Sequence, residues 1–223
     1  MSLGLRALLL DLDGTLVDSR RDIARACNAA LVAVGRPELD EARVVSFVGD
    51  GARLLLARAL EVDASAPIVD EALEPFLESY LAHPVEHTVL LPGVRETLAH
   101  LVERGVLLAL ATNKPRPVAL AVLEGLGILP WFPSVAAGGD VPRLKPDPAV
   151  LERAYAGLGS SRPPRSAVGM VGDSPVDVVA GRAFGATTIA VLGPFVPEHV
   201  LRASGPDHLL ERFADLEALV VAR

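Results

Sequence analysis

Short runs of apolar residues alternate, along most of the chain, with segments in which apolar residues recur every three or four positions. A short apolar run bounded by turn residues predicts a buried strand, whereas the three-to-four spacing predicts an amphipathic helix. Strands are expected at residues 5–10, 106–111, 134–137, 167–171 and 187–192. Helices are expected between and after them, near residues 94–102, 115–126, 148–158, 175–184 and 214–221. Strands that alternate with helices predict a parallel sheet with right-handed crossovers.

The alternation is interrupted after the first strand by a block in which every expected element is a helix. These helices fall near residues 19–34, 40–48, 52–60 and 67–81, with Asp18 or Ser19 as the expected cap of the first. Residues 17–85 are called the helical insert below. The predicted fold class is α/β, with a doubly wound parallel sheet formed by residues 1–16 and 86–223 and a small α-helical domain inserted at 17–85.

Composition and charge exclude several classes of protein to which this chain could belong. The chain has 223 residues, of which 51% are hydrophobic, so it can bury a sizeable core. Its formal net charge of -7 argues against a nucleic-acid-binding surface. Cys27 is the single cysteine, which excludes an intrachain disulfide and suits a reducing compartment. The N-terminal apolar run is too short for a signal peptide, and no run is long enough and free of charge to span a membrane. We therefore expect a cytoplasmic monomer or homodimer without membrane or nucleic-acid partners.

The basic residues are almost all arginine. Of the 21 lysines and arginines only two are lysines, Lys114 and Lys145. A lysine kept against this bias indicates a need for a compact ammonium where a planar guanidinium would fit badly, with chance as the alternative. The positions of these two lysines are therefore informative.

Polar residues follow several of the expected strands. Asp11 and Asp13 come directly after the first strand, Thr112 after the second and Asp173 after the fourth. Ligands of open parallel sheets bind at the carboxyl ends of the strands, so these residues are expected at one edge. Asp11 and Asp13 would face the same side, and the repulsion between them would be relieved by a cation or a shared proton.

Each motif also has a purely structural interpretation. Asp11 to Gly14 could form a surface turn, and Lys145 could be a solvated charge in a turn. Thr112 could cap a helix, as could the residues before Pro175. Together, in this order and at strand ends, the motifs favour a site.

The set resembles the four motifs of the haloacid dehalogenase-like superfamily, over nearly the whole chain. Residues 11–16 match the first motif, Thr112 the second, Lys145 the third, and Gly172 and Asp173 with Asp177 the fourth. The resemblance implies a Rossmann-like core, with the helical insert as a cap, and a phosphatase. It also implies that Asp11 is a nucleophile that forms an aspartyl-phosphate, and that Asp13 is the general acid and base.

The resemblance assigns further roles at the same edge. Lys145 would balance the charge of phosphate and Asp11, while Thr112 and Asn113 would hold phosphate oxygens. Mg²⁺ would lie between the Asp11 carboxylate, the Asp13 backbone carbonyl and Asp173. The neighbours expected to support this site are Ser174 and Asp177; the second could hold Lys145 or a metal-bound water.

Within the superfamily, residues 47–52, 112–115, 138–140 and 145–148 resemble phosphoglycolate phosphatases. The substrate would then be a small phosphorylated metabolite with a carboxylate beside the phosphate. The expected contacts to it are Gly49, Gly51, Arg53 and Lys114, although Arg53 could equally be a solvated charge on a helix. Residues 193–197 depart from the Gly-aromatic-Gly turn common among relatives. A pyrophosphatase, a sugar-phosphate phosphatase and a non-catalytic binding or regulatory protein remain as alternatives.

Overall fold

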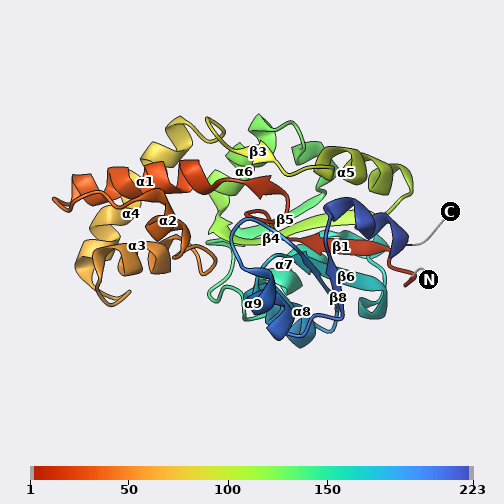
Figure 1. The fold of residues 1–223 in the computed structure, drawn as a ribbon. Coiled ribbons are helices and arrows are strands. Elements are labelled where there is room, and N and C mark those ends of the chain that lie inside the picture. Colours follow the sequence, from red (N-terminus) through yellow and green to blue (C-terminus); the bar gives the residue numbers. More distant parts are fainter. Residues whose placement is uncertain (1–2, 221–223) are drawn as a thin grey trace.

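A six-stranded parallel sheet forms the centre of the computed structural model, which describes residues 3–220 (Figure 1). The strands are β1 (Ala7–Leu10), β4 (Leu107–Pro115), β5 (Ser134–Gly138), β6 (Val168–Gly172), β7 (Thr187–Val191) and β8 (His208–Leu210). Their order is β5-β4-β1-β6-β7-β8. The predicted α/β fold class is thus confirmed. Strand β1 lies between β4 and β6, so the three strands whose ends carry the predicted site residues are neighbours.

Helices cover both faces of the sheet because its strands are apolar on both sides. Along β1, Leu8 and Leu10 belong to one buried cluster, whereas Ala7 and Leu9 belong to another. This alternation follows from the two-residue period of a strand. The helices α5 (Val94–Glu103) and α6 (Arg116–Gly125) lie on one face, with α7 (Ala149–Gly157) and α8 (Pro175–Phe184) on the other (Figure 1).

The helical insert lies beyond one end of the sheet, at the left of Figure 1. Its helices are α1 (Arg20–Ala33), α2 (Glu41–Val45), α3 (Ala52–Leu60) and α4 (Pro67–Ala82). The chain enters and leaves it through an antiparallel pair, β2 (Val17–Asp18) and β3 (Val89–Leu90). Sequence analysis missed this pair because two-residue strands are too short to show a period. The buried Asp22 side chain adds a second connection by accepting hydrogen bonds from the backbone of His87 and Thr88.

Two other elements differ from expectation. Strand β4 continues to Pro115 instead of ending at residue 111, because a residue that precedes proline disfavours helical backbone and Lys114 therefore stays extended. The expected final helix at 214–221 is wrong: residues Phe213–Ala218 form 3₁₀ turns, which place the buried Phe213 and Leu216 on one side. Residue 221 lies outside the described part.

The remaining elements are short. They are the helix α9 (Glu198–Ala203) and 3₁₀ turns at Leu129–Trp131, Gly159–Ser161 and Arg165–Ala167. Among residues 3–220, no helix has the length and apolar character needed to cross a membrane.

Candidate active site

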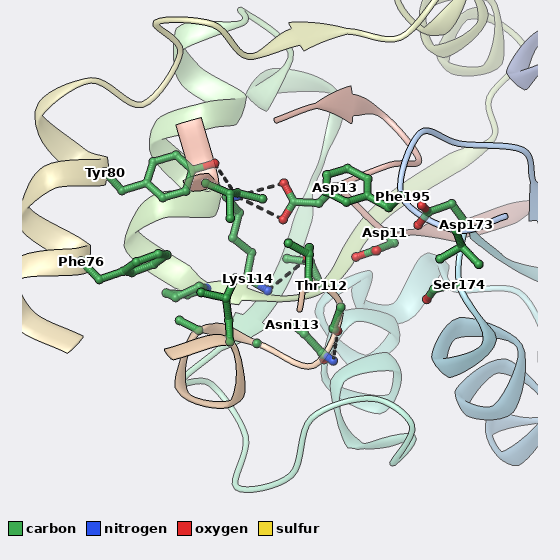
Figure 2. Close-up of a pocket in the computed structure, with 18 residues that line it drawn as sticks. Asp11, Asp13, Phe76, Tyr80, Thr112, Asn113, Lys114, Asp173, Ser174 and Phe195 are labelled. Carbon is green, nitrogen blue, oxygen red and sulfur yellow. Dashed lines mark hydrogen bonds and ion pairs between the residues drawn. The ribbon is translucent and has the colours of Figure 1, made fainter. Parts of the chain in front are cut away.

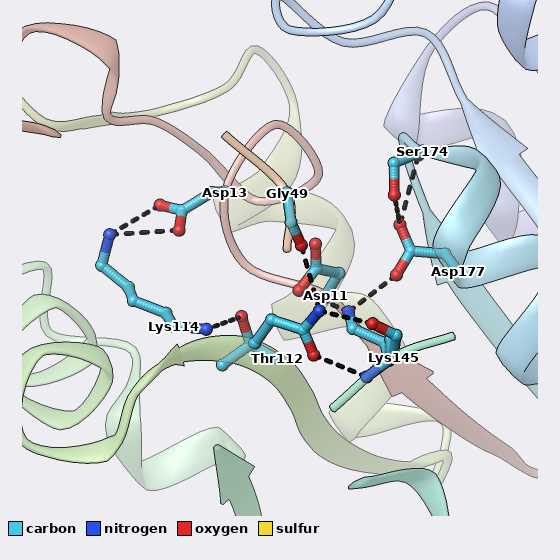
Figure 3. Close-up of polar contacts among 9 residues, drawn as sticks. Asp11, Asp13, Gly49, Thr112, Lys114, Lys145, Ser174 and Asp177 are labelled. Carbon is cyan, nitrogen blue, oxygen red and sulfur yellow. Dashed lines mark hydrogen bonds and ion pairs between the residues drawn. The ribbon is translucent and has the colours of Figure 1, made fainter. Parts of the chain in front are cut away.

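Asp11 and Lys145 form a buried ion pair at the carboxyl end of β1. Asp11 is the first residue after the strand, and its Oδ1 lies 2.8 Å from Lys145 Nζ. The same Nζ donates to Asp177 Oδ1 at 2.7 Å, and the Lys145 side chain is only 1% exposed (Figure 3). Burial alone would lower the pKa of Lys145, but the charges of Asp11 and Asp177 outweigh it and raise that pKa above its usual value. The lysine is therefore a fixed ammonium beside Asp11.

The start of α8 fixes the position of Asp177. Its second carboxylate oxygen, Oδ2, accepts from the backbone N–H of Ser174 at 3.2 Å and from the Ser174 hydroxyl at 2.6 Å. The two residues form a capping box at the first turn of the helix. Both oxygens of Asp177 are thus bound, one to the helix start and the other to Lys145.

Three carboxylates converge beside this pair. Asp11, Asp173 and Asp177 each offer an oxygen, and these oxygens lie within 4.8 Å of one another. Burial raises the pKa of Asp11 to about 6 although Lys145 opposes the shift. Burial, followed by the charges of Asp177 and Asp11, raises the pKa of Asp173 well above its usual value. Like charges this close together need a counter-charge or a shared proton.

Asp173 Oδ2 is the atom that most clearly fits a cation. It is buried and has no hydrogen-bond partner among the described residues. Gly14, with φ +83°, packs so closely that a Cβ would lie 2.0 Å from this oxygen. A Cβ at Gly193 would lie 3.0 Å from the same atom. An unpartnered carboxylate oxygen beside two others is a donor set that suits a hard divalent cation.

Asp13 points away from this cluster, toward the helical insert. Its Oδ1 and Oδ2 lie 2.9 and 3.1 Å from Lys114 Nζ (Figure 2). Lys114 Nζ also donates to the hydroxyl of Tyr80, on α4, at 2.7 Å. Ser19 precedes α1 as expected, but its hydroxyl donates to Asp13 and not to the helix backbone. The two lysines of the chain therefore each hold one of the two aspartates of the first motif.

Thr112 and Asn113 lie in β4 and line the pocket beside Asp11. Thr112 is 2% exposed, and its hydroxyl accepts from the backbone N–H of Lys114 at 3.3 Å. The Asn113 amide nitrogen donates to the carbonyls of Gly49 and Lys145 at 3.0 and 2.9 Å. Its oxygen accepts from the Lys145 N–H at 2.8 Å. The Asn113 side chain thus joins the Lys145 segment to a loop of the insert.

A pocket opens between the sheet edge and the insert (Figure 2). Predicted site residues that line it are Asp11, Asp13, Gly49, Gly51, Thr112, Asn113, Lys114, Asp173 and Ser174. Sequence analysis did not single out the remaining wall as site residues, although Val48, Ala52 and Pro115 lie in motifs that it noted. This part of the wall is formed by Ile23, Val48, Ala52, Leu55, Phe76, Tyr80, Pro115, Phe195 and Val196. Helical spacing predicts that such residues face inward, but it does not separate a solid core from a cavity wall. For Phe195 the sequence offers one signal, namely that residues 193–197 lack the Gly-aromatic-Gly turn common among relatives.

Arg53 does not reach the pocket. It is exposed, donates to the carbonyl of Ala64 at 2.9 Å and pairs with Asp70 on α4. Arg53 is the second residue of α3, and its neighbours Ala52 and Leu55 take the pocket side. This position, outside the pocket and paired with Asp70, favours the alternative interpretation of Arg53 as a solvated charge on a helix.

The fold and this site define a class of protein. A buried carboxylate held by a lysine at the edge of a parallel sheet, with a second carboxylate two residues later, suits hydrolysis through a carboxylate nucleophile. The model of the haloacid dehalogenase-like hydrolases matches residues 8–191, a range that includes all four motifs. The chain belongs to this family.

Individual relatives agree with this assignment. The phosphoglycolate phosphatase of Pectobacterium atrosepticum is 39% identical over 220 residues, which cover 97% of this chain and 92% of that protein. The crystal structure of a predicted phosphoglycolate phosphatase from Haemophilus somnus 129pt is 28% identical and has a TM-score of 0.84. The match covers 97% of this chain and 98% of the chain in that structure. The crystal structure of CbbY from Rhodobacter sphaeroides in complex with phosphate is 27% identical to this chain and has a TM-score of 0.80. The match covers 95% of this chain and 96% of CbbY.

Proposed function

We propose that this chain hydrolyses phosphomonoesters through an aspartyl-phosphate, with 2-phosphoglycolate as its substrate and glycolate and phosphate as products. The observation that carries the proposal is the buried Asp11–Lys145 pair, 2.8 Å apart at the end of the central strand. A carboxylate held in this way can attack, and the adjacent ammonium offsets the charge that phosphate brings.

Two displacements make up the reaction. An Asp11 oxygen forms a bond to phosphorus while the bond from phosphorus to the ester oxygen breaks, and Asp13 gives that oxygen a proton. Asp13 then accepts a proton from water, which attacks phosphorus, releases phosphate and restores Asp11. Thr112 and backbone N–H groups near it hold the phosphate oxygens, so positioning supplies much of the acceleration.

The carboxylate cluster fits Mg²⁺, which prefers oxygen ligands. The residues that would hold it are Asp11 and Asp173 through their carboxylates and Asp13 through its backbone carbonyl. Bound there, the ion would neutralise charge on the phosphate oxygens. Ser174 and Asp177 support this arrangement, because they fix the start of α8 directly after Asp173.

The helical insert, residues 17–85, is the cap domain in this proposal, and residues 1–16 and 86–223 are the catalytic core. The insert closes over the sheet edge, keeps water from the nucleophile and selects the leaving group. The loop with Gly49 and Gly51 packs closely against the core: a Cβ at Gly51, where φ is +91°, would lie 3.3 Å from the backbone oxygen of Asn113.

The lining of the pocket favours a small anionic leaving group. Lys114 is the one cationic side chain among the described residues that line the pocket. The insert wall, with Ile23, Leu55 and Phe76, offers few partners for the hydroxyl groups of a sugar, and unpaired buried hydroxyls are costly. Phosphoglycolate phosphatases among the relatives support the same choice over pyrophosphate or a hexose phosphate.

A substrate panel tests this function. The purified protein is assayed for phosphate release from 2-phosphoglycolate, glucose 6-phosphate and pyrophosphate, each with Mg²⁺ and with excess EDTA. We expect the highest kcat/KM for 2-phosphoglycolate and no turnover in EDTA. A higher value for pyrophosphate or the hexose phosphate would overturn the substrate but not the mechanism, whereas hydrolysis of none would favour the binding-protein alternative.

A second measurement tests the metal site without activity. We expect Mg²⁺ to raise the thermal midpoint of the wild-type protein, because a ligand that binds only the folded state stabilises it. The increase should be lost in Asp173→Asn, which keeps the shape but removes one ligand charge. An equal increase in both proteins would place the ion elsewhere.

A further inference from the structure

Lys114 is held by the sheet and by the helical insert at the same time. Its Nζ lies 2.9 and 3.1 Å from the two Asp13 oxygens and 2.7 Å from the Tyr80 hydroxyl. The ammonium also lies 4.3 Å from the centre of the Tyr80 ring. Figure 2 shows this chain of contacts crossing the pocket from Asp13 to α4.

All three N–H groups of Lys114 have acceptors, but the two Asp13 oxygens differ in the number of donors that they have. An ammonium has three N–H groups, and Lys114 has three acceptors within reach. Asp13 Oδ1 has a second donor, the Ser19 hydroxyl. Among the residues that the structure describes, Asp13 Oδ2 has only Lys114 as a hydrogen-bond donor, and at the longer distance of 3.1 Å. The contact to Oδ2 is therefore the one that an incoming anion can replace at the lowest cost.

We propose that Lys114 is the receptor for an anionic group on the leaving side of the substrate, and that Tyr80 is the positioning residue that holds Lys114 there. The proposal rests on the phosphomonoester hydrolysis proposed above, and it attributes the preference for an anionic leaving group to Lys114. A substrate carboxylate takes the N–H that Oδ2 had used. Oδ2 is then free to face the ester oxygen, the atom to which Asp13 gives its proton.

The connectivity of 2-phosphoglycolate suits this exchange. One carbon separates its ester oxygen from its carboxylate, so an ester oxygen at Asp13 brings the carboxylate within reach of the neighbouring Nζ. The Lys114 side chain is 3% exposed, which strengthens a charge-assisted contact relative to one in water. A neutral hydroxyl of the same length is a weaker acceptor than a carboxylate, so it competes poorly with Asp13 Oδ2 for the ammonium.

Tyr80 contributes to this arrangement by fixing the position of Lys114 Nζ. Its side chain is buried on α4, where it packs against Phe76 with the ring centres 5.9 Å apart. The hydroxyl therefore enters from a fixed direction and keeps Nζ at the mouth of the insert. Because Tyr80 belongs to the insert and Asp13 to the core, the receptor is complete only when the two are together.

The test compares two esters of equal length, 2-phosphoglycolate and 2-hydroxyethyl phosphate, in the intact chain. The measured quantity is the ratio of their kcat/KM values. Lys114→Met should lower this ratio by about ten- to a hundred-fold, the effect of losing one charge-assisted hydrogen bond. Tyr80→Phe, which keeps the ring, should lower it by about three- to ten-fold through a higher KM for 2-phosphoglycolate, with the neutral ester unaffected.

Arg53→Met is the matched control, because it removes an exposed cation of the insert that does not line the pocket. Its ratio should equal that of the wild type. An equal fall for both esters in Lys114→Met and Tyr80→Phe would indicate a structural role and overturn the proposal, as would a wild-type ratio below one. A ratio changed only in Lys114→Met would overturn the role of Tyr80. Hydrolysis of neither ester by the wild type would instead refute the proposed function.

Discussion

The two walls of the pocket differ in chemistry. The wall formed by the sheet carries charged groups such as Asp11 and Asp173 next to strand ends. Asp11 is in turn held by Lys145, which also contacts Asp177, although these two residues do not line the pocket. The wall formed by the helical insert is mainly apolar, as at Leu55 and Phe76, and its one phenol is Tyr80. Lys114 reaches from the first wall to the second.

This difference separates two tasks. Charges fixed on a sheet need little rearrangement as a reaction proceeds, and they interact strongly because burial excludes water. Apolar side chains on a separate set of helices exclude water and set the shape of the cavity, but they stabilise no developing charge. Changes to the sheet wall should therefore affect every substrate, and changes to the insert wall should affect the choice among substrates.

The largest effect is expected from Asp11→Asn. The amide keeps the shape of the carboxylate but cannot attack phosphorus, so kcat should fall by at least about a thousand-fold for every phosphomonoester. Initial rates of phosphate release with 2-phosphoglycolate and with para-nitrophenyl phosphate measure this loss. Near-normal turnover in a preparation free of wild-type enzyme would contradict the covalent mechanism.

Folding of the variant is the control for this result. The raised pKa of Asp11, about 6, means that burial disfavours its charge, so a neutral amide should be tolerated there. The far-ultraviolet circular dichroism spectrum should match that of the wild type. A lost spectrum would make the rate uninformative, and Asp11→Glu, which moves the carboxylate, would then replace it as the test.

A somewhat smaller loss is expected from Lys145→Arg, which keeps the charge. The guanidinium is planar and larger, and the side chain it replaces is 1% exposed between Asp11 and Asp177. We expect kcat/KM to fall by about a hundred-fold or more for all substrates. The matched control is Arg143→Lys, a conservative change at a side chain 75% exposed, which should leave activity unchanged. A fully active Lys145→Arg would mean that Lys145 is only a neighbouring charge.

The sheet wall was also the more predictable of the two. Asp11 and Asp173 directly follow buried strands and Thr112 lies toward the end of one, and topology alone brings these strand ends together. The two lysines stood out because nearly every other basic residue is arginine. Local pattern and chain composition therefore predict which residues gather at this edge of the sheet, but not how they pair: the contact between Lys114 and Asp13 was not expected.

The insert wall depends on contacts that sequence does not encode locally. Tyr80 and Phe76 lie four residues apart on one helix, which predicts a buried face but not that the face borders a cavity. The place of Arg53 outside the pocket could not be predicted for the same reason, because its position beside the Gly-Asp-Gly loop does not reveal that it faces Asp70. Such details depend on how the helices pack, and hence on long-range contacts.

A moderate effect is expected where the walls join, at Asn113. Asn113→Asp keeps an oxygen to accept from the Lys145 N–H but loses the donor to the carbonyls of Gly49 and Lys145. Two unpaired carbonyls and a new buried charge should lower the thermal midpoint and reduce kcat/KM by about ten-fold or more, since a buried group without its partner costs about 1–3 kcal/mol. Steady-state kinetics and thermal unfolding measure both, with Asn28→Asp as a control that breaks an Asn–backbone contact inside the insert. Equal kinetics in Asn113→Asp and the wild type would show that the two walls act independently.

The smallest change in rate is expected from Leu55→Ala, which enlarges the cavity on the insert side. Leu55 is 4% exposed and lines the pocket, so its removal should also lower the free energy of unfolding, by about 2–5 kcal/mol. No charged group of the sheet wall moves, so kcat/KM for 2-phosphoglycolate should fall only a few-fold. The kcat/KM for the larger para-nitrophenyl phosphate should rise by about ten-fold relative to that for 2-phosphoglycolate, the typical effect of small changes in an apolar pocket.

The ratio of the two kcat/KM values measures this gain. Leu56→Ala serves as the control for lost packing, because Leu56 is a buried residue of the same helix that does not line the pocket. If the two variants changed the ratio equally, loosened packing would explain it, and the insert wall would not be the part of the molecule that selects the leaving group.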